Sequence, residues 1–279
     1  MIKITKDDYK KITCKRLKGS AKKKMLKQID NFYNCDAYVK EPHPYKVGDK
    51  VFLKKGTLLH GTYKNLEGLE EISKNGPISS MFTEGRMSKY PNSVGLWSLK
   101  KDCYLDEYIN FYSGGTLEYI STDSKRMKTC VIPYSDMKNI MNIIDANICF
   151  RWRMEQTKEA RFMPSIVQDR IQIGIIFNAS NKYIKPLLEN DVLGDNFTDK
   201  ELKYFVKPSF YHKFLEDKKH KDDFFTDREK APLFGIPSSF IEGILVGRIY
   251  EEDKDTLKKI KLLLPDAYIC NLDGKVILI

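Results

Sequence analysis

His60 is one of four histidines in the chain, and it lies at the end of an apolar run in the stretch GTLLHGT, residues 56–62. Gly61 follows it directly, so a planar ligand can approach the backbone closely beside the imidazole ring. A carboxamide suits such a position, because main-chain N–H and C=O groups can bind both of its polar atoms. The nicotinamide amide of NAD is such a ligand, and a neutral imidazole can bind a ribose hydroxyl. The alternative is an ordinary histidine at a turn that ends a strand.

The elements around His60 are predicted from the same region. The stretch KVFLKKGTLLHGT, residues 50–62, indicates two short β-strands around Gly56. NLEGLEEISKNG, residues 65–76, predicts a helix, because its apolar residues share one face, Asn65 can cap its start and Gly76 follows its end. The predicted order is therefore a strand that ends in His-Gly-Thr, followed by a helix and a glycine.

This order resembles the first motif of ADP-ribosyltransferases of the histidine type, in which a strand ending His-Gly-Thr leads into a helix and then Gly. The resemblance covers about twenty residues, LLHGTYKNLEGLEEISKNG. The chain also resembles a bacterial family of uncharacterised domains associated with defence against phage. In that comparison Trp152, Glu155, Glu159 and Arg161 stand for a W-x-x-E-x-x-x-E-x-R pattern, and IEGILVG matches the final strand.

The resemblance implies transfer of ADP-ribose from NAD to a macromolecular acceptor, a protein or a nucleic acid, with release of nicotinamide. Breaking the N-glycosidic bond leaves an oxocarbenium-like ribose, so a carboxylate is expected beside it. Glu159 is the first candidate, because it opens the predicted strand EARFMPS, and Glu155 and Glu242 are the alternatives. Glu159 has a second interpretation, as a surface partner of Arg161 or Lys158.

A binding site for NAD is expected to contain His60, Gly61 and Thr62 from the first motif and an aromatic ring that stacks on nicotinamide. Tyr90 and Tyr112 are the candidates for that ring, and Ser98 is a candidate polar contact. Neither tyrosine lies in a G-x-Y or S-x-S pattern, which is a departure from the resemblance.

The rest of the chain predicts an α+β protein with a mixed, largely antiparallel sheet. Beyond residue 45 we expect strands near 94–99, 128–134, 159–165 and 171–178, and helices near 102–114 and 135–156, with Ser135 as the cap of the second helix. Residues 181–230 are charged and aromatic and predict an insertion or surface helices. The end of the chain predicts a strand, a helix, a strand, a turn at Asp273-Gly274 and a last strand. The resemblance implies that the sheet is a split core of the ADP-ribosyltransferase type with flanking helices.

Residues 1–34 hold ten Lys and one Arg against three Asp, so this segment carries +8 of the net charge of +10. Its spacing predicts two short amphipathic helices separated at Gly19-Ser20. We expect residues 1–44 to form a basic helical segment with a linker, and residues 45–279 to form the catalytic domain. The lysines have two interpretations, a solvated helix face or a surface that binds nucleic acid. The second supports an alternative function, a nucleic-acid-binding protein without enzymatic activity.

Six widely spaced cysteines, without a C-x-x-C pair or histidines at ligand spacing, favour buried reduced thiols over disulfides or a metal site. No apolar run approaches the length of a membrane span, and the first residues show no secretory signal, so a cytoplasmic protein without membrane contact is expected. Motifs for a P-loop, a dinucleotide-binding glycine loop or a hydrolase elbow are missing from the sequence.

Overall fold

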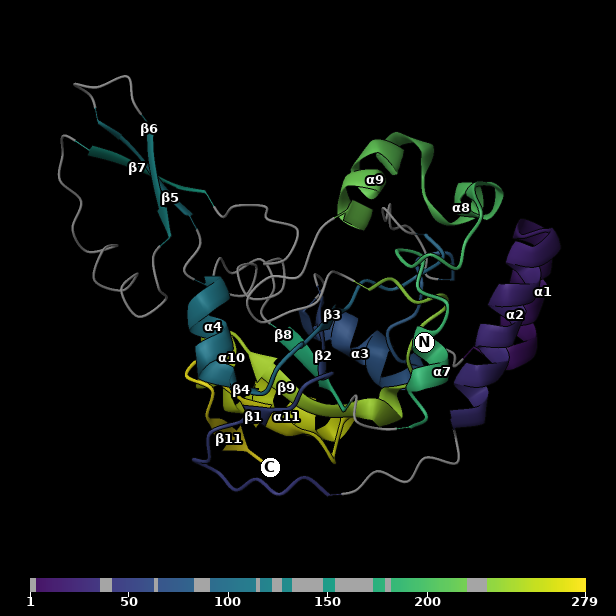
Figure 1. The fold of residues 1–279 in the computed structure, drawn as a ribbon. Helices are drawn as coiled ribbons and strands as arrows, with labels where there is room; N and C mark the ends of the chain where they lie inside the picture. The colour runs from purple at the N-terminus through teal and green to yellow at the C-terminus, as the bar shows by residue number, and fades with distance from the viewer. Residues whose placement is uncertain are drawn as a thin grey trace.

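A computed structural model describes residues 4–35, 42–62, 65–82, 91–113, 116–121, 127–131, 148–153, 173–178, 182–219 and 230–279 (Figure 1). Within these residues the strands form sheets of six, three and two strands, and helices lie between the strands along the chain. The chain is therefore a mixed α and β protein, as the sequence predicts. In the described ranges, no helix combines the length and the apolar character that crossing a bilayer requires.

The largest sheet has the strand order β11-β10-β9-β8-β2-β3. In that order the strands are Val276–Leu278, Tyr268–Cys270, Ile241–Val246, Ile173–Phe177, Leu58–Thr62 and Trp97–Ser98. Neighbouring strands are antiparallel except β9 and β10, which are parallel. The prediction of a mixed, largely antiparallel sheet is confirmed, and β2, which carries His60, lies between β8 and β3.

The two smaller sheets pair β1 (Phe52–Leu53) with β4 (Cys103–Tyr104), and β5 (Thr116–Ser121) with both β6 (Met127–Val131) and β7 (Ile148–Arg153). Strand β7 shows that the helix predicted over 135–156 was wrong for its last part. Phe150-Arg151-Trp152-Arg153 alternates apolar and basic residues, which is the period of a strand. Residues 132–147 and the strand predicted at 159–165 lie outside the described residues.

Helices that are capped by residues near them in the sequence begin and end close to their predicted positions. The bounds are α1 Lys6–Arg16, α2 Gly19–Asn34, α3 Asn65–Asn75, α4 Leu105–Ser113, α7 Lys185–Leu188, α8 Asp199–Phe205, α9 Tyr211–Lys219, α10 Arg248–Glu251 and α11 Lys254–Leu263, with short 3-10 turns η2 Pro208–Phe210 and η3 Ser238–Phe240. Gly76 ends α3 with a φ of 69°, and its amide donates to the carbonyl of Ile72 at 2.7 Å. This left-handed residue is the helix end that the sequence predicts. Asp253 caps α11 by accepting from the amides of Asp255 and Thr256.

The two faces of the large sheet carry two different apolar clusters, because successive side chains of a strand point to opposite faces. Leu58 of β2, Ile175 of β8 and Ile244 of β9 belong to the larger cluster. Leu59, Ile176 and Leu245, each one position further along its strand, belong to the smaller cluster. Helices α3 and α11 contact each other and contribute Leu69, Ile72 and Ile260 to the larger cluster, whereas α4 contributes Leu105, Tyr108 and Ile109 to the smaller one.

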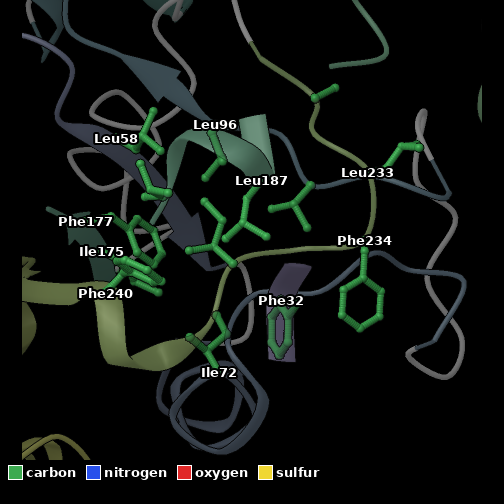
Figure 2. Packing of buried hydrophobic residues seen from close by; sticks show 14 of the residues in the cluster. Phe32, Leu58, Ile72, Leu96, Ile175, Phe177, Leu187, Leu233, Phe234 and Phe240 are labelled. Atoms are coloured by element: carbon green, nitrogen blue, oxygen red, sulfur yellow. The ribbon is translucent and has the colours of Figure 1, made fainter. Parts of the chain in front are cut away.

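Helices α1 and α2 belong to the larger cluster as well. Figure 2 shows Phe32 of α2 and Phe234 in the same packed group as Leu58 and Phe177 of the sheet. The rings of Phe32 and Phe234 are 4.9 Å apart in an edge-to-face arrangement. The two predicted amphipathic helices are thus present, and their apolar faces are buried in the main core. The predicted domain boundary at residues 44 and 45 stays a prediction.

The predicted surface helices of residues 181–230 also contribute to this core. Leu187 of α7, Phe205 of α8 and Phe214 of α9 are fully buried. The prediction of helices is confirmed in this region. These helices do not lie only on the surface, because their aromatic and aliphatic side chains are buried in the main core. Residues 220–229, which hold part of the most charged stretch, lie outside the described residues.

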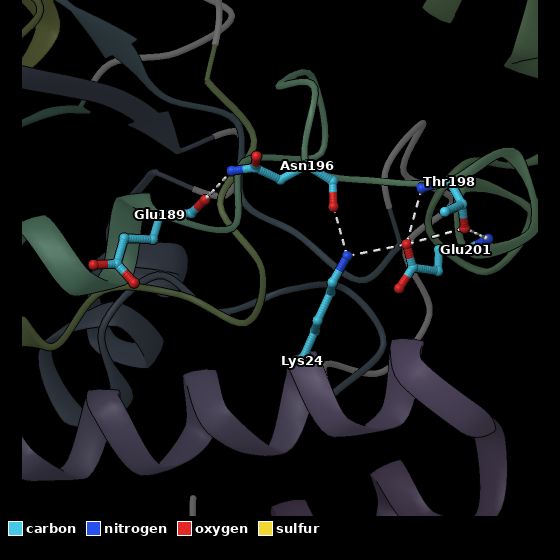
Figure 3. Close-up of polar contacts among 5 residues, drawn as sticks. All are labelled: Lys24, Glu189, Asn196, Thr198 and Glu201. Carbon is cyan, nitrogen blue, oxygen red and sulfur yellow. Dashed lines mark hydrogen bonds and ion pairs between the residues drawn. The ribbon is translucent and has the colours of Figure 1, made fainter.

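A partly buried ion pair joins α2 to α8, as Figure 3 shows. Lys24 donates to the Glu201 carboxylate at 3.0 Å and to the carbonyl of Asn196 at 2.5 Å. Glu201 also accepts from the amide of Thr198 at 2.9 Å, and the Thr198 hydroxyl accepts from the amide of Glu201 at 3.3 Å. Burial alone would raise the pKa of Glu201, but hydrogen bonds from Thr198, Lys24 and Ser20 outweigh it and lower the pKa to about 2.

Replacing Glu201 with glutamine is expected to lower the free energy of unfolding at pH 7 by about 1–2 kcal/mol, because a neutral amide binds Lys24 and the amide of Thr198 less strongly than the carboxylate does. The stabilisation is fully present above the ordinary carboxyl pKa of 4.5 and is lost as the pH falls toward 2. Urea unfolding at pH 7 and at pH 3 measures both effects, and the difference between wild type and Glu201→Gln should shrink at pH 3.

Glu189→Gln is the matched control, because its ion pair with Lys27 has a distance of 3.5 Å and both side chains are more than half exposed. Exposed pairs contribute about 0–1 kcal/mol. Equal losses of stability in the two variants would contradict the expectation that the Lys24–Glu201 pair stabilises the fold more than the exposed Lys27–Glu189 pair.

Candidate functional site

The candidate site is built around His60, which lies within β2. Residues 58–62 of β2 pair with 177–173 of β8, so His60 is opposite Ile175 and Gly61 is opposite Gly174. Leu58 and Leu59 pair with Ser98 and Trp97 of β3 on the other side. His60 is half-buried between these two neighbouring strands, where its backbone position is fixed by ladder hydrogen bonds.

The ring of His60 is held by the backbone of the segment that leads into β3. Its Nδ1 lies 2.9 Å from the carbonyl oxygen of Gly95. A carbonyl only accepts hydrogen bonds, so this contact assigns the proton of the neutral ring to Nδ1. The Nε2 atom of that tautomer is then a hydrogen-bond acceptor, which is the character needed to bind a hydroxyl group.

The backbone of Gly61 is directed toward the β3 side of β2. The amide of Leu99 donates to the carbonyl of Thr57 at 3.0 Å, so the carbonyl of Thr57 points toward the β3 segment. In an antiparallel strand every second residue points the same way, which places the N–H and C=O of Gly61 on this side too. The pairs between β2 and β3 end at Leu59 and Trp97 in the described residues. The N–H and C=O of Gly61 are therefore expected on the β3 side, two positions beyond the last β2–β3 pair.

Gly61 of β2 pairs with Gly174 of β8, so two adjacent strands have no side chain at this position of the sheet. Sequence reasoning identified Gly61 but missed Gly174 and Gly95. A glycine inside a strand often marks a close backbone approach, so the sequence IQIGIIFN contained a signal for Gly174. No such signal was available for Gly95, because only the fold brings its carbonyl to His60.

Thr62 and Ser98 were both predicted to contact the cofactor. The side chains of Thr62 and His60 share one face of the sheet, because they are two residues apart in the same strand. Ser98, opposite Leu58, lies on that face as well. Both are nearly inaccessible, with exposed fractions of 5% for Thr62 and 3% for Ser98. The structure thus brings Thr62 and Ser98 to the His60 face, on strands adjacent to each other.

Glu242 is the one candidate carboxylate that lies in the described residues, and it is part of an irregularity in β9. Phe177 pairs with Ile241 and Ile176 pairs with Gly243, so Glu242 is the extra residue of a β-bulge. Burial raises the pKa of Tyr45 and of Tyr268, and the negative charge of Glu242 contributes to both shifts.

Both of these tyrosines pack in or against the smaller cluster, on the sheet face opposite that of His60. His60 shares its face with Ile175 and Ile244 of the larger cluster. The two tyrosines that the charge of Glu242 influences therefore lie on the other side of the sheet from His60.

For the remaining predicted residues, the structure describes either the backbone alone or nothing. Glu155, Glu159, Arg161 and Tyr90 lie outside the described residues. Tyr112 lies in α4 and Trp152 lies in β7, where the backbone of Trp152 is opposite that of Leu117; their side chains are likewise outside the description.

Cys103 and Cys270 are among the described cysteines that are buried. Burial raises the pKa of the Cys103 thiol to about 12 and also raises that of Cys270, which disfavours the thiolate that a nucleophile requires. The described part of the chain contains no group of three or more His, Cys, Asp or Glu side chains arranged to hold a metal ion.

Comparisons with models of known protein families, with curated proteins and with solved structures find no match to this chain.

Proposed function

We propose that the chain is an NAD-dependent ADP-ribosyltransferase that acts on a macromolecular acceptor. The observation that carries the proposal is that the imidazole of His60 and the backbone of Gly61 lie next to each other at the end of β2. Gly61 lies two positions beyond the last β2–β3 pair, and Nδ1 of His60 beside it lies 2.9 Å from the carbonyl oxygen of Gly95. The mixed, largely antiparallel sheet supports the proposal, because the resemblance implies a split sheet with flanking helices.

In the proposed complex, the backbone of Gly61 binds both polar atoms of the nicotinamide carboxamide, and Nε2 of His60 accepts from a ribose hydroxyl. These contacts fix the base and the sugar on either side of the bond that breaks. The N-glycosidic bond then breaks with its electron pair leaving on nicotinamide. A nucleophilic atom of the acceptor bonds to the ribose carbon and loses its proton.

A carboxylate is needed to stabilise the cationic ribose in this reaction. Glu159 is the first candidate for this role, because it opens the strand predicted from EARFMPS, and Glu155 and Glu242 are the alternatives. Tyr90 or Tyr112 would stack on nicotinamide. A role as a toxin or a phage-defence effector, and a cytoplasmic site of action, follow from the resemblance and from the sequence and remain part of the proposal.

The test is incubation of the purified protein with labelled NAD and a bacterial lysate. Transfer of the label to a macromolecule is expected, and nuclease and protease treatment of the product then identify the acceptor class. Glu159→Gln should lower the rate by about 100- to 1,000-fold, because it removes the charge that stabilises the developing cation.

Glu252→Gln is the control, since Glu252 is an exposed carboxylate at the end of α10, and it should keep the wild-type rate. Unchanged transfer in all of Glu159→Gln, Glu155→Gln and Glu242→Gln would contradict the assignment of the carboxylate. A lack of NAD turnover with every lysate fraction would contradict the proposed function.

A further inference from the structure

The lysines of α1 and α2 fall into two groups when their contacts are compared. Between Asp8 and Asp30 the sequence holds nine basic residues and no acidic one. Lys6 and Lys10 both bind Asp30 at 2.9 Å, Lys24 binds Glu201 and Lys27 binds Glu189. These four lysines are used in attaching the two helices to each other and to the rest of the protein.

Five other lysines have no ion pair with any described residue. They are Lys11, Lys15, Lys18, Lys22 and Lys23, and we refer to them as the basic tip. Four of them are exposed and Lys22 is half-buried. They surround the two-residue connection between α1 and α2, at the right-hand side of the molecule in Figure 1.

The basic tip faces away from the core. The buried face of α1 is formed by Tyr9 and Thr13, whereas Lys11 and Lys15, two positions further along, lie about 200° around the helix from them. Helix α2 begins at Gly19 without a side-chain cap, so its first amides add partial positive charge at the same place. The result is a predominantly basic surface, in which Lys11 lies near enough to Asp8 to help lower the pKa of that carboxyl.

We infer that the basic tip binds the phosphate backbone of a nucleic acid. Lysine is a point charge on a flexible stem, which suits phosphate contacts without reading base sequence. A membrane surface is disfavoured, because an interfacial helix needs exposed apolar side chains. The large apolar residues of α1 and α2, such as Leu17, Met25 and Phe32, are buried, and the exposed large hydrophobic residues of the described chain all lie elsewhere. This inference stands independently of the proposed enzymatic activity.

The experiment is a titration of a fluorescently labelled random 20-base-pair duplex with the full chain, followed by anisotropy at several salt concentrations. Binding should weaken with a slope of log K against log salt near −4, because up to about five phosphates are neutralised. Changing the five lysines of the basic tip to glutamine should weaken binding at least about 100-fold and flatten the slope.

A control variant changes five exposed lysines elsewhere to glutamine, so that net charge falls by the same amount: Lys54, Lys55, Lys200, Lys254 and Lys258. It should lose less than about fivefold in affinity. Equal losses in the two variants would show that only the total charge matters and would overturn the inference. Binding to phosphatidylserine vesicles without binding to the duplex would also overturn it, in favour of a membrane surface. Circular dichroism of both variants confirms that they are folded.

Discussion

His60→Ala is expected to lower kcat/KM for NAD by about 100-fold while the protein remains folded. The variant removes the acceptor that binds the ribose hydroxyl, and a small displacement of the reacting sugar has a cost of this order. The loss of the 2.9 Å contact with Gly95 should reduce stability by only about 1 kcal/mol, which is typical for one hydrogen bond. Initial rates of nicotinamide release, measured over a range of NAD concentrations, test the prediction.

Two further variants separate catalysis from structure. Asparagine at position 60 keeps a donor that can bind the carbonyl of Gly95 but has no acceptor at the position of Nε2, so His60→Asn should be as inactive as His60→Ala and more stable. His212→Ala, at an exposed position of α9, should keep the wild-type rate. If His60→Asn retained full activity, His60 would be a structural residue of β2 and would have no role in binding NAD.

Gly76→Ala is expected to reduce the free energy of unfolding by about 2–5 kcal/mol. The residue has a φ of 69°, which costs an alanine about 1–2 kcal/mol. An added Cβ would also overlap the carbonyl oxygen of Ile236, a backbone atom that a rotamer change cannot move aside. Overpacking of this kind adds about 1–3 kcal/mol. Chemical unfolding of the variant and the wild type measures the sum.

Two other glycines separate these contributions. Gly48 has a φ of 95° with open space around its missing Cβ, so Gly48→Ala should show the backbone cost alone. At Gly243 an added Cβ would overlap the ring of Tyr268, so Gly243→Ala should show the steric cost without a left-handed φ. A loss at position 76 no larger than that at position 48 would mean that the contact with Ile236 relaxes without cost.

Features set by neighbours in the sequence were predicted well. Helix α3 and the glycine that ends it follow from apolar spacing and a local cap, and the turn at Asp273-Gly274 lies between β10 and β11 as expected. The break between α1 and α2 also lies close to Gly19-Ser20. Each of these depends on hydrogen bonds and backbone angles within a few residues, which the amino-acid types largely determine.

Features set by pairing between distant segments were not predicted. The bulge at Glu242 depends on the register between β8 and β9, and the influence of its charge on Tyr45 and Tyr268 depends on the fold. A single strand sequence does not reveal which of its faces meets a given partner. The contact between His60 and Gly95 has the same origin, so the candidate histidine could be found from the sequence but the group that orients it could not.

The attachment of α2 to distant segments has a consequence for synthesis of the chain. Gln28 donates to the carbonyl of Leu187, 159 positions later, and Lys24 reaches Glu201, 177 positions later. At a translation rate of roughly 5–20 residues per second, these partners are synthesised on the order of 10 s after α2. During that interval Met25 and Ile29 are exposed on a nascent chain, so we expect chaperones that recognise apolar helices to bind there on the ribosome.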